Sequence, residues 1–133
     1  MLKDGKEAVK WFRKAAEQGY AAAQYNLGAM YDSGQGVLKN DKEAVKWYRK
    51  AAEQGDASAQ LNLGRMFVLG RGVLEDSVMA YAWWNIASAN GDSSARDNKS
   101  KLAKKMTTEQ IAEAQKLSRK LYDEIEKRKS KGK

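Results

Sequence analysis

The stretch KEAVKWFRKAAEQG at residues 6–19 returns almost unchanged as KEAVKWYRKAAEQG at residues 42–55. A second stretch, AQYNLGAMYDSGQGVL at 23–38, returns as AQLNLGRMFVLGRGVL at 59–74. Both pairs are displaced by 36 residues. A fixed period of this length is the signature of a repeat architecture, so the repeat decides the fold before local propensity does.

The period divides the chain into units. Residues 4–39 and 40–75 share 24 of 36 positions, and a degenerate third unit covers 76–106. The third unit keeps several residues in phase with the second: Ala80, Trp83, Ala87, Gly91, Ala95 and Asn98. Residues 1–4 also match residues 37–40, so the sequence begins inside a repeat. Whether a further copy of the repeat precedes it stays open.

Each unit has the pattern of two helices. In the first helix of the first unit, apolar residues recur at the spacing of one helix face. Asp4 with Glu7 has the spacing of a capping pair, which is repeated in the second unit at Asn40 and Glu43. The second helix covers about 22–33. Gly28 and Gly64 fall inside second helices, where glycine costs about 1 kcal/mol relative to alanine, so a repeated glycine predicts a close approach of two helices.

A single helix pair cannot bury its own apolar face, but stacked pairs can. We therefore predict an all-α chain: a right-handed α-solenoid of tandem antiparallel helix pairs, forming one domain over residues 1–133. In the third unit Asp97, Lys99 and Ser100 replace Leu61, Leu63 and Gly64, which indicates a polar end face. An apolar stripe at 107–128 predicts a C-terminal capping helix, which begins with the capping-box spacing of Thr107 and Gln110. We expect the chain to fray from about Lys127.

Composition narrows the chemistry. The chain has no cysteine and no histidine, which excludes disulfides, Cys nucleophiles, His bases and Cys/His zinc sites. No apolar run is long enough to span a membrane, and no signal-peptide pattern opens the sequence. The net charge of +8 is uneven, because residues 96–133 carry +7 of it.

The motif AAxxGxxxAQxxLGxMYxxGxGVxxDxxxAxxWYxKAA resembles the Sel1-like repeat family, which is related to tetratricopeptide repeats. The resemblance covers residues 4–96, and the stretch from Ala80 to Leu117 is similar to the usual end of bacterial arrays of this family. It implies a solenoid that acts as an adaptor or scaffold for a protein or peptide partner. Some cysteine-rich bacterial members were linked to penicillin binding and β-lactamase activity, but this chain has no cysteine.

The same resemblance implies that the second helix of each unit lines the concave surface. Matching the motif residue by residue places a set of candidate partner-binding residues there: Tyr25, Asn26, Ala29, Asp32, Leu61, Asn62, Arg65, Val68, Asp97, Asn98 and Lys101. No catalytic residue, metal ligand or cofactor is expected.

Two alternatives stay open for these residues. Asn26, Asn62 and Asn98 recur at one phase, and an amide has the donors and acceptor to bind peptide backbone, but each could instead bond a neighbouring helix or water. Tyr25, Leu61 and Val68 either form an apolar binding patch or pack on the next helix. We expect Trp11, Trp47, Trp83 and Trp84 to be core residues.

Other patterns give weaker hypotheses. Gly34-Gln35-Gly36 and Gly70-Arg71-Gly72 follow helices, so we interpret them as turns instead of phosphate loops. The spacing Ser-x-x-Lys occurs only at Ser130–Lys133, and a nucleophile needs a rigid setting, so we expect no enzyme. A hydrolase of the β-lactamase-like type, which the family resemblance implies for some members, stays the alternative.

The basic C-terminal part could attract an acidic peptide or nucleic acid, but acids interleave and stacking aromatics are scarce, so we expect no nucleic-acid site. An acidic peptide docking toward Arg65, Lys101 and Lys104 stays open. The final helix either caps its own chain or supports weak self-association.

Overall fold

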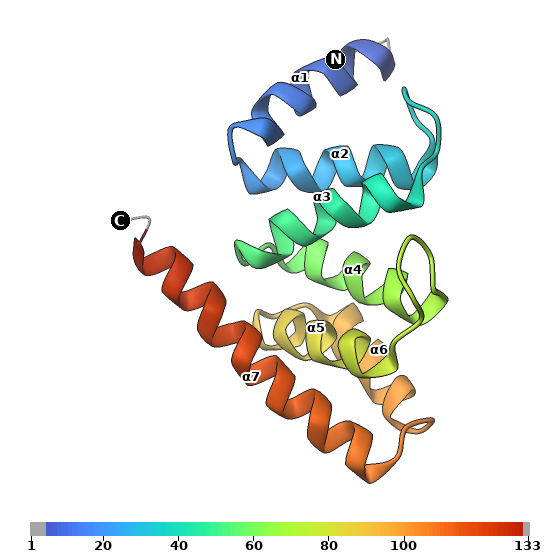
Figure 1. Cartoon of the computed structure of the whole chain (residues 1–133), viewed down its shortest axis with the longest axis vertical. Helices are drawn as coiled ribbons and strands as arrows, with labels where there is room; N and C mark the ends of the chain where they lie inside the picture. The colour runs from blue at the N-terminus through green and yellow to red at the C-terminus, as the bar shows by residue number, and fades with distance from the viewer. Residues whose placement is uncertain (1–4, 132–133) are drawn as a thin grey trace.

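The computed structural model describes residues 5–131, and within this range every regular element is an α-helix (Figure 1). The seven helices are α1 (Gly5–Glu17), α2 (Ala21–Ser33), α3 (Asp41–Glu53), α4 (Ala57–Leu69), α5 (Ser77–Ala89), α6 (Ser93–Ala103) and α7 (Thr108–Lys131). The predicted all-α class is confirmed. Residues 1–4, with their match to residues 37–40 and the cap at Asp4, lie outside the described residues.

The first six helices form three antiparallel pairs that follow one another along the long axis of the molecule (Figure 1). Each of these six helices packs on its neighbours in the chain, and the contacts between α2 and α3 and between α4 and α5 join one pair to the next. The predicted α-solenoid of tandem helix pairs is therefore confirmed.

Side-chain caps start most of the helices. Asn40, Asp56, Asp76 and Asp92 each accept a hydrogen bond from the backbone N–H three residues ahead, at 2.8 to 3.1 Å. Such a cap stabilises a helix by about 1 kcal/mol. Before α7, Thr107 and Gln110 bond each other's backbone N–H reciprocally, which confirms the capping box expected there. At the other end of α2 and α4, Gly34 and Gly70 adopt the left-handed conformation.

The glycines inside α2 and α4 mark the closest helix contacts. A Cβ added to Gly28 would lie 2.8 Å from Cδ1 of Tyr48, and one added to Gly64 would lie 2.3 Å from Nε1 of Trp84. Tyr48 and Trp84 are register equivalents, 36 residues apart, on the first helix of the following pair. The close approach predicted from the repeated glycine is thus made by an aromatic ring of the next unit.

The tryptophans divide between core and surface. Trp47, Trp83 and Trp84 are buried as expected, but Trp11 is 60% exposed, so that prediction is wrong for Trp11. Trp47 is buried because it packs in one cluster with residues of α1 and α2. Among the described residues no helix pair covers Trp11 in the corresponding way. The register predicts a side chain's environment only where the preceding pair is present.

Two buried glutamines hydrogen-bond the two helices of their own unit to each other and to the following unit. Gln24 and Gln60 donate to the carbonyls of Ala16 and Ala52, at 3.1 and 3.0 Å. Their side-chain oxygens accept hydrogen bonds from Gln54 at 2.7 Å and from Asn90 at 3.4 Å, each in the following unit. Buried amides that are satisfied in this way are structural, because all their partners belong to the protein itself.

Helix α7 packs along α5 and reaches α3 near its own C-terminal end (Figure 1). Ala114, Ser118 and Ile125 are its buried residues. The expectation of fraying from Lys127 is wrong, because the helix continues to Lys131. Ile125 anchors this last part in the core, and an Arg128 guanidinium nitrogen lies 3.7 Å from a carboxylate oxygen of Glu53.

Candidate partner-binding surface

The predicted binding residues all lie on α2, α4 and α6, the second helices of the three pairs. We call the exposed side of these helices the second-helix face. Helix α7 lies along α5 and reaches α3, so the first helices carry the C-terminal cap. The resemblance assigned the concave, partner-binding surface to the second helices.

Three asparagines repeat along the second-helix face. Asn26, Asn62 and Asn98 are half-buried, at equivalent positions of α2, α4 and α6. Within residues 5–131, no hydrogen bond of their side-chain amides to another protein group is found, whereas Gln24 and Gln60 each donate one side-chain hydrogen bond and accept one. Each asparagine therefore has an amide whose donors and acceptor are not used by another group of residues 5–131.

Two regions of this face join one unit to the next, and they differ in chemistry. The first junction lies between α2, α3 and α4 and centres on Asp32, which the sequence placed in the binding set. The Asp32 carboxylate accepts hydrogen bonds from the Tyr48 hydroxyl at 3.0 Å, from Arg71 at 2.6 Å and from Arg65. Arg71 also bonds Asp41, at 2.9 Å. Only 12% of the Asp32 side chain is exposed, so it is committed to this network.

The network shifts the acidity of its members. Burial of the Asp32 carboxyl raises its pKa, but the hydrogen bond and charge of Arg65, with the bonds from Tyr48 and Arg71, bring the net pKa below its usual value. Hydrogen bonds from Arg71 and Lys39 lower the pKa of Asp41 to about 2. Burial, followed by the Asp32 charge, raises the pKa of Tyr48. Both carboxylates are therefore ionised at neutral pH.

The second junction lies between α4, α5 and α6 and is hollow. Its cavity has a volume of about 170 Å³ and is lined by Val68, Trp84, Asn98, Lys101, Leu102 and Lys105. Three of the predicted residues (Val68, Asn98 and Lys101) thus meet at one cavity. The Trp84 ring is fixed, because its Nε1 donates to the Leu61 carbonyl at 2.9 Å. In the part of the chain that the structure describes, neither Lys101 nor Lys105 forms an ion pair.

The apolar residues among the predicted set are partly packed on the core and partly exposed. The Tyr25 ring lies 5.9 Å from the Tyr48 ring, and Tyr25, Leu61 and Val68 are half-buried against the core. The sequence analysis missed Arg71 in the first junction and Trp84, Leu102 and Lys105 in the second. Register alone could have suggested Trp84, since it is the equivalent of Tyr48, but nothing in the sequence links Arg71 to Asp32.

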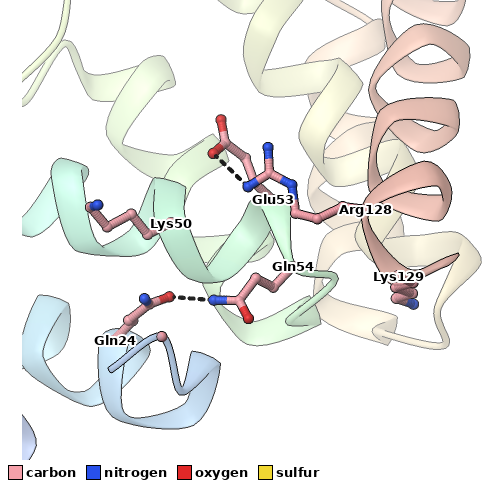
Figure 2. Close-up of a pocket in the computed structure, with 7 residues that line it drawn as sticks. Gln24, Lys50, Glu53, Gln54, Arg128 and Lys129 are labelled. Atoms are coloured by element: carbon pink, nitrogen blue, oxygen red, sulfur yellow. Dashed lines mark hydrogen bonds and ion pairs between the residues drawn. The ribbon is translucent and has the colours of Figure 1, made fainter. Parts of the chain in front are cut away.

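A larger hollow lies elsewhere on the molecule. It has a volume of about 490 Å³, between the α1–α2 turn, the end of α3 and the last turns of α7. Figure 2 shows Arg128 pointing toward Glu53 and Gln54 toward Gln24 across this space. The neighbouring Lys129 side chain contacts the position that a Cβ on Gly55 would occupy. These polar groups pair with each other, so the hollow is a seam where α7 meets the earlier repeats.

Residues 5–131 contain neither a candidate metal site nor a helix that could cross a membrane. No group of three or more acidic residues there could hold a metal ion. No helix in that range has the length and apolar character that a membrane crossing requires.

Comparison with known proteins agrees with the architecture. The Sel1 repeat family model matches residues 1–20, 21–56 and 57–92. No curated protein matches the chain. One similar solved structure is the crystal structure of a protective antigen present in uropathogenic Escherichia coli strains, which displays an SLR fold. The similarity covers 90% of this chain and 26% of the antigen chain, with 43% sequence identity and a TM-score of 0.88.

A second similar structure is that of a Sel1 repeat protein from Oxalobacter formigenes. The similarity covers 74% of this chain and 41% of the other chain, with 44% sequence identity and a TM-score of 0.72. The chain therefore spans less than half the length of either of these solved relatives. The in-phase helix pairs, the family match over most of the sequence and these two structures lead to one conclusion: the chain belongs to the Sel1 repeat family.

Proposed function

We propose that this chain is a non-catalytic interaction module that binds a partner protein through an extended peptide segment laid along the second-helix face. Sel1 repeats are commonly protein-interaction scaffolds. The observation that carries the proposal is the row of half-exposed amides at Asn26, Asn62 and Asn98, which lack hydrogen bonds to other groups of the described chain. A row of amides can bond a peptide backbone at successive positions without demanding a particular sequence.

The scaffold supports such binding because it is already formed. The second-helix face is built on packed helices, and Gln24 and Gln60 hydrogen-bond the second helix of a unit to the end of its first helix. A surface that is ordered before binding loses little conformational entropy when the partner arrives. Three units offer a limited area, so we expect a modest affinity.

Neither the hydrolase nor the nucleic-acid alternative has an observation in its favour. Ser130 is exposed on the last turn of α7, and Lys133 lies outside the described residues, so the Ser-x-x-Lys hypothesis gains no rigid site. The basic residues of the C-terminal part are divided between the end of α6 and α7, and two of them are already engaged. Lys99 donates to Asn85 at 2.9 Å, and Arg96 lies 3.8 Å from Asp97.

The experiment is affinity capture from a cell lysate with three baits. The wild-type chain is compared with an Asn26→Ala, Asn62→Ala variant and with a matched Gln18→Ala, Gln115→Ala variant. The control removes two exposed amides that lie outside the second helices. All three baits are first checked for equal helicity and melting temperature.

We expect a partner that wild type and the glutamine control retain and that the asparagine variant releases. Equal retention by all three baits would move the binding surface away from the second-helix face and would contradict the proposal.

A further inference from the structure

The two junctions occupy the same register, yet only one of them contains an acid. Asp32, Tyr48 and Arg65 at the first junction correspond to Val68, Trp84 and Lys101 at the second. At the first junction the arginine is neutralised by Asp32. At the second junction the equivalent base, Lys101, faces valine and tryptophan. The second junction therefore keeps the base of this arrangement without its acid.

At the second junction a cavity lies beside Val68, the equivalent of Asp32, and its lining is partly apolar and partly polar. Val68, Trp84 and Leu102 form an apolar side, and Lys101, Lys105 and Asn98 form a polar side. The volume of about 170 Å³ suits one apolar side chain, since an engineered cavity of about 150 Å³ binds benzene. The lysines present at least two positive charges that no acid of the described chain neutralises.

We propose, building on the binding function above, that the second junction is a specificity pocket for an apolar residue next to an aspartate or glutamate in the partner peptide. The apolar side chain enters between Val68 and Trp84. The carboxylate beside it pairs with Lys101, as Asp32 pairs with Arg65 one unit earlier. The amide of Asn98 bonds the peptide backbone between the two.

Fixed geometry makes the pocket selective. The Trp84 indole is held by its bond to Leu61, so the apolar wall does not need to order when a ligand binds. A ligand with a neutral amide in place of the carboxylate would leave Lys101 and Lys105 without a negatively charged partner. A ligand with a basic residue there would meet charges of the same sign.

The test begins with selection of random dodecapeptides displayed on phage, with the wild-type chain as target. The best peptide is synthesised with an acetylated N-terminus and an amidated C-terminus, so that its only carboxylates are on side chains. Its binding is measured by fluorescence anisotropy, beside a version in which the acidic residue is changed to its amide.

Three protein variants locate the contact. Lys101→Glu reverses the charge at the pocket. Lys104→Glu is the matched control: the sequence offered Lys104 as a docking base beside Lys101, but it is exposed and does not line the cavity, so the pocket proposal predicts little effect. Val68→Asp supplies the acid that the first junction already has, and it should close the pocket from within. All variants are checked for helicity and melting temperature before binding is measured.

We expect enriched peptides to carry an apolar residue beside an acidic one. Lys101→Glu, which puts a like charge against the ligand, and Val68→Asp should each weaken binding about tenfold, the amide version of the peptide about threefold, and Lys104→Glu less than about twofold. A peptide with lysine in place of the acid should bind Lys101→Glu better than wild type. This charge exchange keeps the test decisive if one variant alone is poorly folded.

Other results would overturn the proposal. These are enriched peptides without an acid, equal effects of Lys101→Glu and Lys104→Glu, or binding that requires a free C-terminal carboxylate. If Asn26→Ala, Asn62→Ala abolishes binding while Lys101→Glu does not, the pocket is wrong but the second-helix face stands. If no peptide is enriched, or no variant of that face changes binding, both the pocket and the proposed function fail.

Discussion

The first and second junctions of this solenoid share a backbone arrangement and have opposite surface chemistry. At the first, Asp32 accepts bonds from Tyr48, Arg65 and Arg71, which ties α2, α3 and the end of α4 together. At the second, Val68 and Trp84 stand in the equivalent places beside a cavity of about 170 Å³ and beside Lys101, which pairs with no acid of residues 5–131. One register position can therefore fasten two repeats in one unit and remain available to a ligand in the next.

The largest expected effect concerns the glycines under the two junctions. A methyl group at Gly64 would lie 2.3 Å from Trp84 Nε1, which is held by its bond to Leu61. At Gly28 the nearest atom is the Tyr48 ring edge at 2.8 Å. We expect Gly64→Ala to lower the free energy of unfolding by about 3 kcal/mol and Gly28→Ala by about 1 kcal/mol, after the gain in helix propensity. Urea denaturation followed by circular dichroism measures both, and equal losses would show that the two contacts are equally tight.

The next effect exchanges the chemistry of the junctions. Asp32→Val gives the first junction the residue of the second and leaves Tyr48, Arg65 and Arg71 without their shared acceptor. We expect a loss of about 2 kcal/mol in the free energy of unfolding. The reciprocal change, Val68→Asp, should cost less than half as much, because Lys101 can pair with the new acid. The same denaturation experiment applies, and the reverse order of stability would contradict the comparison.

Acid should affect the first junction more than the second. The pKa of Asp41 is about 2 in the folded chain and near 3.8 without its partners, and that of Asp32 is also lowered. Between these pH values the unfolded chain binds more protons, so the free energy of unfolding falls as the pH drops through this window. Asp41→Asn should flatten that dependence by a small amount, because its pair with Arg71 is partly exposed. Unfolding titrations at a series of pH values measure the slope, and an unchanged slope in the variant would rule out this contribution.

The smallest effect is expected at the end of α7. The Arg128–Glu53 ion pair spans 3.7 Å between largely exposed side chains. Such pairs contribute little, so Arg128→Ala should change the free energy of unfolding by less than about 0.5 kcal/mol. Ile125→Ala, which removes a buried side chain from the same helix end, is the positive control. A loss from Arg128→Ala as large as that from Ile125→Ala would mean that charge, and not packing, holds α7 on the repeats.

The repeat makes the fold predictable from sequence, since its period places the helix pairs, the cap at Asn40 and the close contacts of Gly28 and Gly64. It fails for Trp11, because register predicts burial only beside a preceding pair. Composition suggests a frayed tail after Lys127, but burial of Ile125 extends the helix.

The candidate site was only partly predictable. The family pattern put Asp32 and Arg65 on the second-helix face, but their ion pair joins residues 33 positions apart and depends on how one unit rests on the next. The hollow at Val68 depends on the same geometry. The repeated position of Asn26, Asn62 and Asn98 places all three on this face, but the repeat alone does not tell whether their amides bond a neighbouring helix, since the repeated Gln24 and Gln60 do form such bonds.

The central claim is that a partner peptide lies along the second-helix face, and nuclear magnetic resonance tests it most directly. The chain is labelled with nitrogen-15 and titrated with the selected peptide while the side-chain amide signals of Asn26, Asn62 and Asn98 are followed. The account predicts that these signals shift together and in proportion to occupancy, while Gln18 and Gln115 stay in place. Shifts confined to α7 and the end of α3, with the three asparagine signals unmoved, would contradict it.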